Sequence, residues 1–177
     1  MKIEPIFLKG NLVALEPLND GHVGPLCEFG LNEELWRFTF NQITTAEHMR
    51  SYVETALTEE TEGTSLPFIT KPVKSDKIVG CTRFGNIDTA NRKMEVGWTW
   101  IDPEWQRSFV NTEAKLLKLT HAFEVWNCVR VEFKTDVLNV KSRNAIVRIG
   151  AVEEGILRNH MITDSGHFRN SIFFQYP

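Results

Sequence analysis

The spacing of apolar residues changes twice in the middle of the chain, and these changes restrict the fold more than any other feature. Residues 92–101 are rich in branched and aromatic side chains, which is typical of a strand. After Pro103, apolar residues recur at helical spacing as far as Trp126. Residues 129–134 then alternate apolar and charged side chains, as a half-buried strand does, and a short helix ending at Gly150 follows. This order of strand, helix, strand and helix predicts a crossover connection.

Strand-like and helical segments also fill the rest of the chain. The order of elements predicts an α/β fold, in which helices cover both faces of a mixed sheet. Because no linker, repeat or low-complexity tract interrupts residues 1–177, we expect a single domain. The remaining expected elements are a bent strand or hairpin at 7–18, helices that begin after Asn19 or Asp20 and at the capping box of Thr44 and Glu47, a loop at 59–65, strands at 66–70, 77–87, 151–163 and 167–176, and turns at 88–91 and 164–166.

The charge and hydropathy of the chain exclude two classes of partner. A formal net charge of -3 leaves no basic excess to neutralise a phosphate backbone, so we expect no nucleic-acid partner. The chain begins with an early acid and proline, Glu4 and Pro5, in place of an apolar signal sequence. No stretch approaches the roughly 18 uninterrupted apolar residues of a membrane-spanning helix. We therefore expect no membrane partner and a cytoplasmic location.

Cysteine and histidine usage points in the same direction. Cys27, Cys81 and Cys128 are odd in number and widely spaced, which indicates free thiols in a reducing compartment. The five histidines show no short metal-ligand spacing with one another or with the cysteines, so we assign no metal.

Residues 95–114 form the most informative segment, in which a strand passes through a proline turn into the start of the longest helix. The first backbone amides of a helix lack partners within it, and the helix dipole is positive at that end. Such a helix start can hold a pyrophosphate without many cationic side chains. The same pattern also fits a capped helix that binds nothing.

This segment resembles the acyl-CoA-binding segment of GNAT acetyltransferases, in the subgroup that acetylates ribosomal-protein N-termini. The resemblance extends through residues 12–18, 130–136, 139–142 and 149–155. It implies the GNAT fold, with a mostly antiparallel mixed sheet. It also implies direct transfer of an acetyl group from acetyl-CoA to a primary amine, which could belong to a protein N-terminus or to a small molecule. A homodimer is compatible with this family.

The resemblance implies a set of residues that bind acetyl-CoA. The backbone of Trp100 and Ile101 would pair with the pantetheine arm. The family pattern Gln-x-x-Gly-x-Gly, or Gly-x-Ala, is kept at Gln106 but has Phe109 and Asn111 at the small positions, where Phe109 narrows the site unless its ring turns into the core. The amides that would hold the pyrophosphate belong to Arg107, Ser108, Phe109, Val110, Asn111 and Thr112.

The helix that begins near residue 140 carries further implied site residues. By resemblance, Asn139 would bond the pantetheine amides, although it could equally be only an N-cap. Arg143 would reach the 3'-phosphate. Ser142 would lie near the thiol. Because Ile146 stands where many family members have a tyrosine acid, Ser142 or a water would protonate the leaving thiolate.

Glu95 resembles the general base of several family members. The alternative is a solvated strand carboxylate that pairs with Arg83 or Arg92. The aromatic residues Trp36, Phe84, Trp98, Trp100 and Trp105 could line an acceptor cleft or belong to the core.

An alternative hypothesis is that the chain has this fold but does not catalyse acetyl transfer. The residues at 109, 111 and 146 would then mark a non-catalytic acyl-CoA-binding regulatory module.

Overall fold

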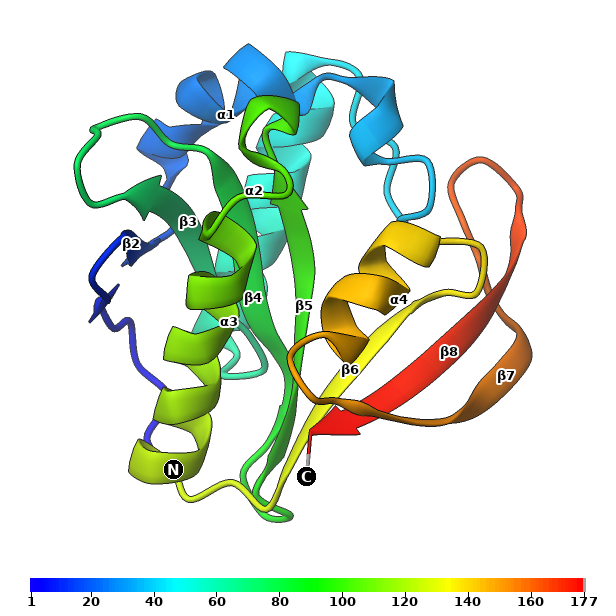
Figure 1. Ribbon diagram of the computed structural model, residues 1–177. Helices are drawn as coiled ribbons and strands as arrows, with labels where there is room; N and C mark the ends of the chain where they lie inside the picture. Colours follow the sequence, from blue (N-terminus) through cyan, green and yellow to red (C-terminus); the bar gives the residue numbers. More distant parts are fainter. Residues whose placement is uncertain (177) are drawn as a thin grey trace.

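The computed structural model describes residues 1–176, which contain an eight-stranded sheet in the order β1-β2-β3-β4-β5-β6-β8-β7 (Figure 1). Neighbouring strands are antiparallel except for β5 and β6, which are parallel and are joined by the crossover helix α3. The predicted crossover and mixed sheet are therefore confirmed. The strands are β1 (Leu8–Lys9), β2 (Val13–Pro17), β3 (Leu66–Pro72), β4 (Gly80–Asp88), β5 (Lys93–Ile101), β6 (Arg130–Asp136), β7 (Val152–Ile162) and β8 (Phe168–Tyr176).

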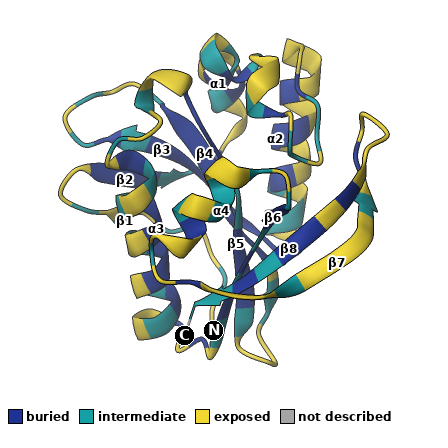
Figure 2. Cartoon of the chain, turned by 45° about the vertical axis from the view of Figure 1, so that its right-hand side comes forward, coloured by how far each residue is buried: buried dark blue, intermediate teal, exposed yellow. Residues whose placement is uncertain are grey.

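Helices cover both faces of this sheet, as the order of elements predicts. One apolar cluster joins α3 and α4 to the sheet, and a second joins α1 and α2 to its other face. Figure 2 shows that buried residues follow the inner strands, whereas the edge strand β7 is mostly exposed. The helices are α1 (Val23–Gly30), α2 (Ala46–Thr61), α3 (Val110–Thr120) and α4 (Val140–Val147), with short 3-10 turns at Asp20–His22, Glu33–Leu35 and Pro103–Trp105 and a π-helical segment at His121–Val125.

The parallel contact between β5 and β6 is short. Only Lys93, Met94 and Glu95 pair with β6, and the rest of β5 has β4 as its strand partner. Beyond that point β6 continues beside β8, so β5 and β6 diverge. Between the pairs Cys81–Trp100 and Arg83–Gly97, one residue of β4 faces two of β5, Trp98 and Thr99, which places a β-bulge at Trp98. Trp98 has a φ of 48°, in the left-handed region that large side chains rarely adopt.

Two local expectations are wrong. Thr45, and not Thr44, caps α2, because its side chain accepts a hydrogen bond from the backbone N–H of His48 at 3.1 Å. The expected loop at 59–65 begins later, since α2 continues to Thr61. Glu59 faces the sheet near this end of α2 and pairs with Arg83 of β4.

Within residues 1–176, no helix combines the length and apolar character needed to cross a bilayer. The same part of the chain contains no cluster of three or more His, Cys, Asp or Glu side chains arranged to hold a metal ion.

The bulge at Trp98 depends on a glycine across the sheet. A Cβ atom at Gly85 would lie 2.3 Å from the Trp98 ring, which is too close. We predict that Gly85→Ala lowers the free energy of unfolding by about 1–3 kcal/mol, because the ring must move within a packed wall. Denaturant unfolding measures this change.

The matched control is Gly24→Ala in α1, where an added Cβ meets nothing within 4 Å. It should leave the free energy of unfolding unchanged or raise it by up to about 1 kcal/mol, because alanine favours a helix more than glycine does. Equal effects of the two substitutions would contradict this account of the bulge.

Candidate functional site

A cavity of about 320 Å³ lies where β5 and β6 diverge. Its walls come from both strands, the first two turns of α4, the segment between α1 and α2, and one residue each of α2, α3, β7 and β8. The cavity is thus a direct consequence of the short parallel contact. Its lining residues are Trp36, Phe38, Thr39, Phe40, Asn41, Tyr52, Glu95, Val96, Gly97, Trp98, Thr99, Trp100, Lys115, Phe133, Lys134, Thr135, Asn139, Ser142, Ile146, Met161 and Arg169.

The structure brings four of the sequence-predicted site residues together in this cavity, namely Glu95, Trp100, Asn139 and Ser142. Among the five aromatic residues considered from the sequence, Trp36, Trp98 and Trp100 line it. Phe84 is buried in the core on the α3 side, and Trp105 packs against that core without lining the cavity. Three of these aromatic residues therefore line the cavity, and the other two belong to the core or pack against it.

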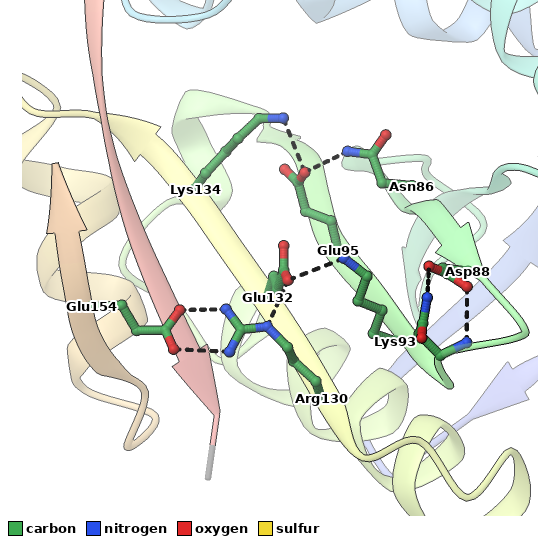
Figure 3. Close-up of polar contacts among 9 residues, drawn as sticks. Asn86, Asp88, Lys93, Glu95, Arg130, Glu132, Lys134 and Glu154 are labelled. Atoms are coloured by element: carbon green, nitrogen blue, oxygen red, sulfur yellow. Dashed lines mark hydrogen bonds and ion pairs between the residues drawn. The ribbon is translucent and has the colours of Figure 1, made fainter. Parts of the chain in front are cut away.

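Glu95 is a buried, ion-paired carboxylate and not a solvated one. Its Oε2 accepts a hydrogen bond from Asn86 Nδ2 at 2.8 Å and lies 3.0 Å from Lys134 Nζ (Figure 3). Oε1 has no hydrogen-bond partner within residues 1–176. The sequence-based alternative, a pairing with Arg83 or Arg92, is wrong, because Arg83 pairs with Glu59 instead. Glu95 thus combines a fixed orientation with one free carboxylate oxygen.

The start of α4 places Asn139 and Ser142 beside each other. Asn139 is the N-cap, since its Oδ1 accepts a hydrogen bond from the backbone N–H of Ser142 at 3.0 Å. The Ser142 side chain is half-buried at the cavity wall, and its hydroxyl has no bonded partner in the described chain. Ile146 is buried one turn further on. Arg143 does not line the cavity, and its guanidinium donates a hydrogen bond to the backbone carbonyl of Val137 at 3.2 Å.

The remaining predicted residues form the segment between β5 and α3. Ile101 ends β5, and its carbonyl accepts a hydrogen bond from Gln106 Nε2 at 3.1 Å. Arg107 has a φ of 60°, which turns the chain toward the helix. The Ser108 hydroxyl accepts from the backbone N–H of Val110 at 3.3 Å.

The Phe109 ring does not enter the core. Its side chain is exposed, and its edge packs against Trp105 with ring centroids 6.1 Å apart. Phe109 has ordinary helical φ and ψ, so the backbone here does not require glycine. The amides of Asn111 and Thr112 follow in the first turn of α3, where the helix itself offers them no acceptor.

Two lysines of α3 are buried, and the sequence analysis missed both. Lys118 Nζ donates to the Thr82 hydroxyl and lies 3.5 Å from the Arg83 carbonyl oxygen. Burial lowers the pKa of the Lys118 ammonium well below its usual value, and Lys115 lowers it further. Lys115 lines the cavity. Helical spacing could have indicated that Lys118 is buried, because it lies four residues after the buried Ala114.

The cavity carries an excess of positive charge. Lys115, Lys134 and Arg169 line it together with one carboxylate, that of Glu95. Burial lowers the pKa of the Lys115 ammonium to about 8, with a further contribution from Arg148. Burial is also the first cause that lowers the pKa of Arg169. This environment stabilises anions more than cations.

A second cavity of about 540 Å³ adjoins the first one. The two share Phe40, Asn41, Tyr52 and Trp98 as walls. Arg83 lies at the second cavity, 2% exposed, with its guanidinium 4.4 Å from the centre of the Tyr52 ring and 3.1 Å from Glu59. The other lining residues are Gln42, Ile43, His48, Ser51, Thr55 and Asp164.

This geometry, in which two parallel strands diverge beside the start of a helix, is accompanied by a match of the sequence to a family model. Residues 13–152 match the family model described as the acetyltransferase (GNAT) domain. The chain belongs to the GNAT acetyltransferase family.

Other GNAT proteins resemble this one in sequence and structure. A Bacillus subtilis (strain 168) protein, provisionally named ribosomal N-acetyltransferase YdaF, is 36% identical over 90 residues, which are 51% of this chain and 49% of that protein. The match thus spans about half the length of this relative. A GCN5-related N-acetyltransferase from Brucella melitensis is 28% identical, with a TM-score of 0.87 over 97% of this chain and 78% of that chain.

A third comparison concerns the fold alone. The Salmonella typhimurium acetyltransferase that modifies the N-terminal serine of ribosomal protein L7/L12 has a TM-score of 0.84 and 18% identity. The alignment covers 96% of this GNAT chain and 98% of that chain.

We predict that Lys134→Met destabilises the GNAT fold by about 3 kcal/mol, because it leaves the Glu95 carboxylate buried without its cation. Adding Glu95→Gln should recover much of this loss, since the amide carries no charge. Denaturant unfolding of both single variants and the double variant gives the coupling energy.

Lys93→Met is the matched control, on the part of β5 that pairs with β6. Lys93 lies 4.0 Å from Glu132 and is 41% exposed, so its removal should cost at most about 1 kcal/mol. A Lys134→Met variant as stable as Lys93→Met would show that the buried Glu95–Lys134 pair does not contribute to the stability of the fold.

Proposed function

We propose that this protein transfers an acetyl group from acetyl-CoA to a primary amine in the cavity between β5 and β6. The observation that carries the proposal is the convergence of Glu95, Trp100, Asn139 and Ser142 on one cavity of a GNAT chain. We place the activity in one domain spanning residues 1–177 and in the cytoplasm.

Acetyl-CoA would approach along the edge of β5 that β6 leaves free. Past Glu95, this edge of β5 has no strand partner, so the backbone near Trp100 and Ile101 is available to the pantetheine amides. The amides of the segment from Arg107 to Thr112 would hold the pyrophosphate at the positive end of α3. Gln106 is the side chain that fixes this segment against the end of β5.

The amine must be neutral when it attacks, because an ammonium has no lone pair. The free Oε1 of Glu95 can accept the proton, directly or through a water, while Lys134 and Asn86 hold Oε2. The positive excess of the cavity also disfavours an ammonium there and favours the anionic tetrahedral intermediate. The same charges serve proton removal and oxyanion stabilisation.

Transfer would be direct, without an acyl-cysteine. Within the described chain, Cys27, Cys81 and Cys128 all lie outside the cavity lining. Burial raises the pKa of each thiol, so none is activated as a thiolate. The acceptor would enter through the second cavity, which shares the Tyr52 and Trp98 walls. In this proposal, the acetyl acceptor is either a protein N-terminus or a small amine.

Calorimetric titration with acetyl-CoA, followed by thiol release against a panel of amines and N-terminal peptides, tests the proposal. We expect saturable binding and amine-dependent release of CoA. Glu95→Gln and Ser142→Ala should lower kcat, the first by about 100-fold, with the acetyl-CoA dissociation constant within about twofold. Glu124→Gln, which removes an exposed carboxylate outside the cavity, is the matched control and should leave both quantities unchanged.

Two outcomes would contradict the proposal in different ways. Absence of acetyl-CoA binding would remove the central claim and would identify Phe109 as the first residue to replace. Binding without release from any acceptor would favour a non-catalytic acyl-CoA-binding module, for which the exposed Phe109 ring at the start of α3 is the specific observation.

A further inference from the structure

Lys115 is an unusual residue for the wall of this cavity because its side chain is buried. It projects from the second turn of α3, is 6% exposed and lines the space between β5 and β6. Its Nζ lies 5.6 Å from the centre of the Phe133 ring, and within residues 1–176 it has no hydrogen-bond or ion-pair partner. A buried ammonium without a carboxylate is costly, so a purely structural role explains it poorly.

The groups that face Lys115 do not neutralise it. Arg148, the C-cap of α4, and Lys118 of α3 are basic, and neither can neutralise the Lys115 ammonium. The other charged groups at the cavity are Glu95 on β5, Lys134 on β6 and Arg169 on β8, and the one carboxylate among them already pairs with Lys134. An anion arriving in this cavity would therefore find an unpaired cation.

The proposed reaction produces such an anion. When the C–S bond of the thioester breaks, its electron pair stays on sulfur, and the thiolate needs a proton or a cation. Ile146 offers neither, and a serine hydroxyl such as that of Ser142 is a very weak acid at neutral pH. The chain therefore lacks an obvious acid among the residues implied by its family resemblance.

We propose that Lys115 is the catalytic acid of this enzyme, whose ammonium stabilises the departing CoA thiolate and protonates it. This inference rests on the proposed acetyl transfer and names a residue for its last step.

The amine lone pair forms the new C–N bond, the tetrahedral intermediate collapses, and the C–S electron pair leaves on sulfur. The Lys115 ammonium gives one proton to the thiolate and becomes a neutral amine. The proton released by the acetylated nitrogen passes through Glu95 or water and recharges Lys115. The products are an N-acetyl amide and CoA with a free thiol.

Three other cations near the site are less suited to this role. Lys134 is held by Glu95, and Arg169 is a guanidinium, which rarely gives up a proton. Lys118 donates to Thr82 and does not line the cavity. The pKa of Lys115, about 8, leaves its ammonium mostly protonated at neutral pH and able to donate.

The direct test follows the thiol of bound CoA, and not turnover alone. The ultraviolet absorbance of the thiolate is titrated with pH for free CoA, for CoA bound to the unmodified protein, and for CoA bound to Lys115→Met. We expect the bound thiol to ionise at lower pH than free CoA. Lys115→Met should raise that ionisation midpoint by about one pH unit or more, which is a tenfold change in the ionisation constant.

Two further variants separate charge from proton donation. Lys115→Arg keeps the cation but is a poor acid, so it should retain the lowered thiol midpoint while kcat falls at least about 10-fold. If Lys115→Met fails to fold, the thiol midpoint and kcat of Lys115→Arg still test the proposal. Lys141→Met removes an exposed lysine at the start of α4 and should leave the thiol midpoint unchanged.

The outcomes distinguish this inference from the proposed function. Equal thiol midpoints for the unmodified protein and Lys115→Met, with CoA bound to both, would overturn the role of Lys115 and leave acetyl transfer standing. Full activity of Lys115→Arg would overturn proton donation. Failure of the unmodified protein to bind CoA would overturn the proposed function and this inference together.

Discussion

The short parallel contact between β5 and β6 is the constraint on which the rest of the site depends. Three residues of β5 pair with β6, and beyond Glu95 the strands separate because β6 follows β8 instead. This separation creates the cavity and leaves one edge of β5 without a strand partner. Crossover helix α3 starts beyond the far end of β5, which directs its unpartnered amides to the same region.

Charge burial is the second feature that shapes the cavity. Glu95 and Lys134 neutralise each other at its wall, and Asn86 completes the contacts of one carboxylate oxygen. Lys115 and Arg169 remain in excess. Folding such charges away from water is unfavourable, and native proteins commonly retain these costs at sites where the charge serves a reaction. Under the proposed function, this excess of positive charge would stabilise the negative charge that develops during acetyl transfer.

Much of the fold could be predicted from the sequence because it follows from local patterns. The change from a strand-like to a helical pattern after Pro103 predicts the crossover, and Asn139 has the chemistry of an N-cap, which it is. The helix ends were less predictable, since Thr44 and Thr45 offer the same hydroxyl and the structure uses Thr45. Glu59 lies in the last turn of α2 and pairs with Arg83, a partner 24 residues away that no local pattern reveals.

The site was predictable in part. Resemblance to GNAT proteins indicated Glu95 and Ser142, and the structure places both in one cavity, although their roles are still proposals. Lys134 as the partner of Glu95 depends on the register of β5 against β6, which no local pattern reveals. Lys115 was hidden for a different reason, because lysine on a helix normally indicates an exposed face.

Hydrogen exchange with and without acetyl-CoA tests the central claim, that the diverging strands bind this substrate, most directly. The account predicts slower amide exchange in residues 97–101, in the first turn of α3 and at the start of α4, with little change in the distant edge strand β7. Protection confined to other segments, or no protection at saturating acetyl-CoA, would contradict it.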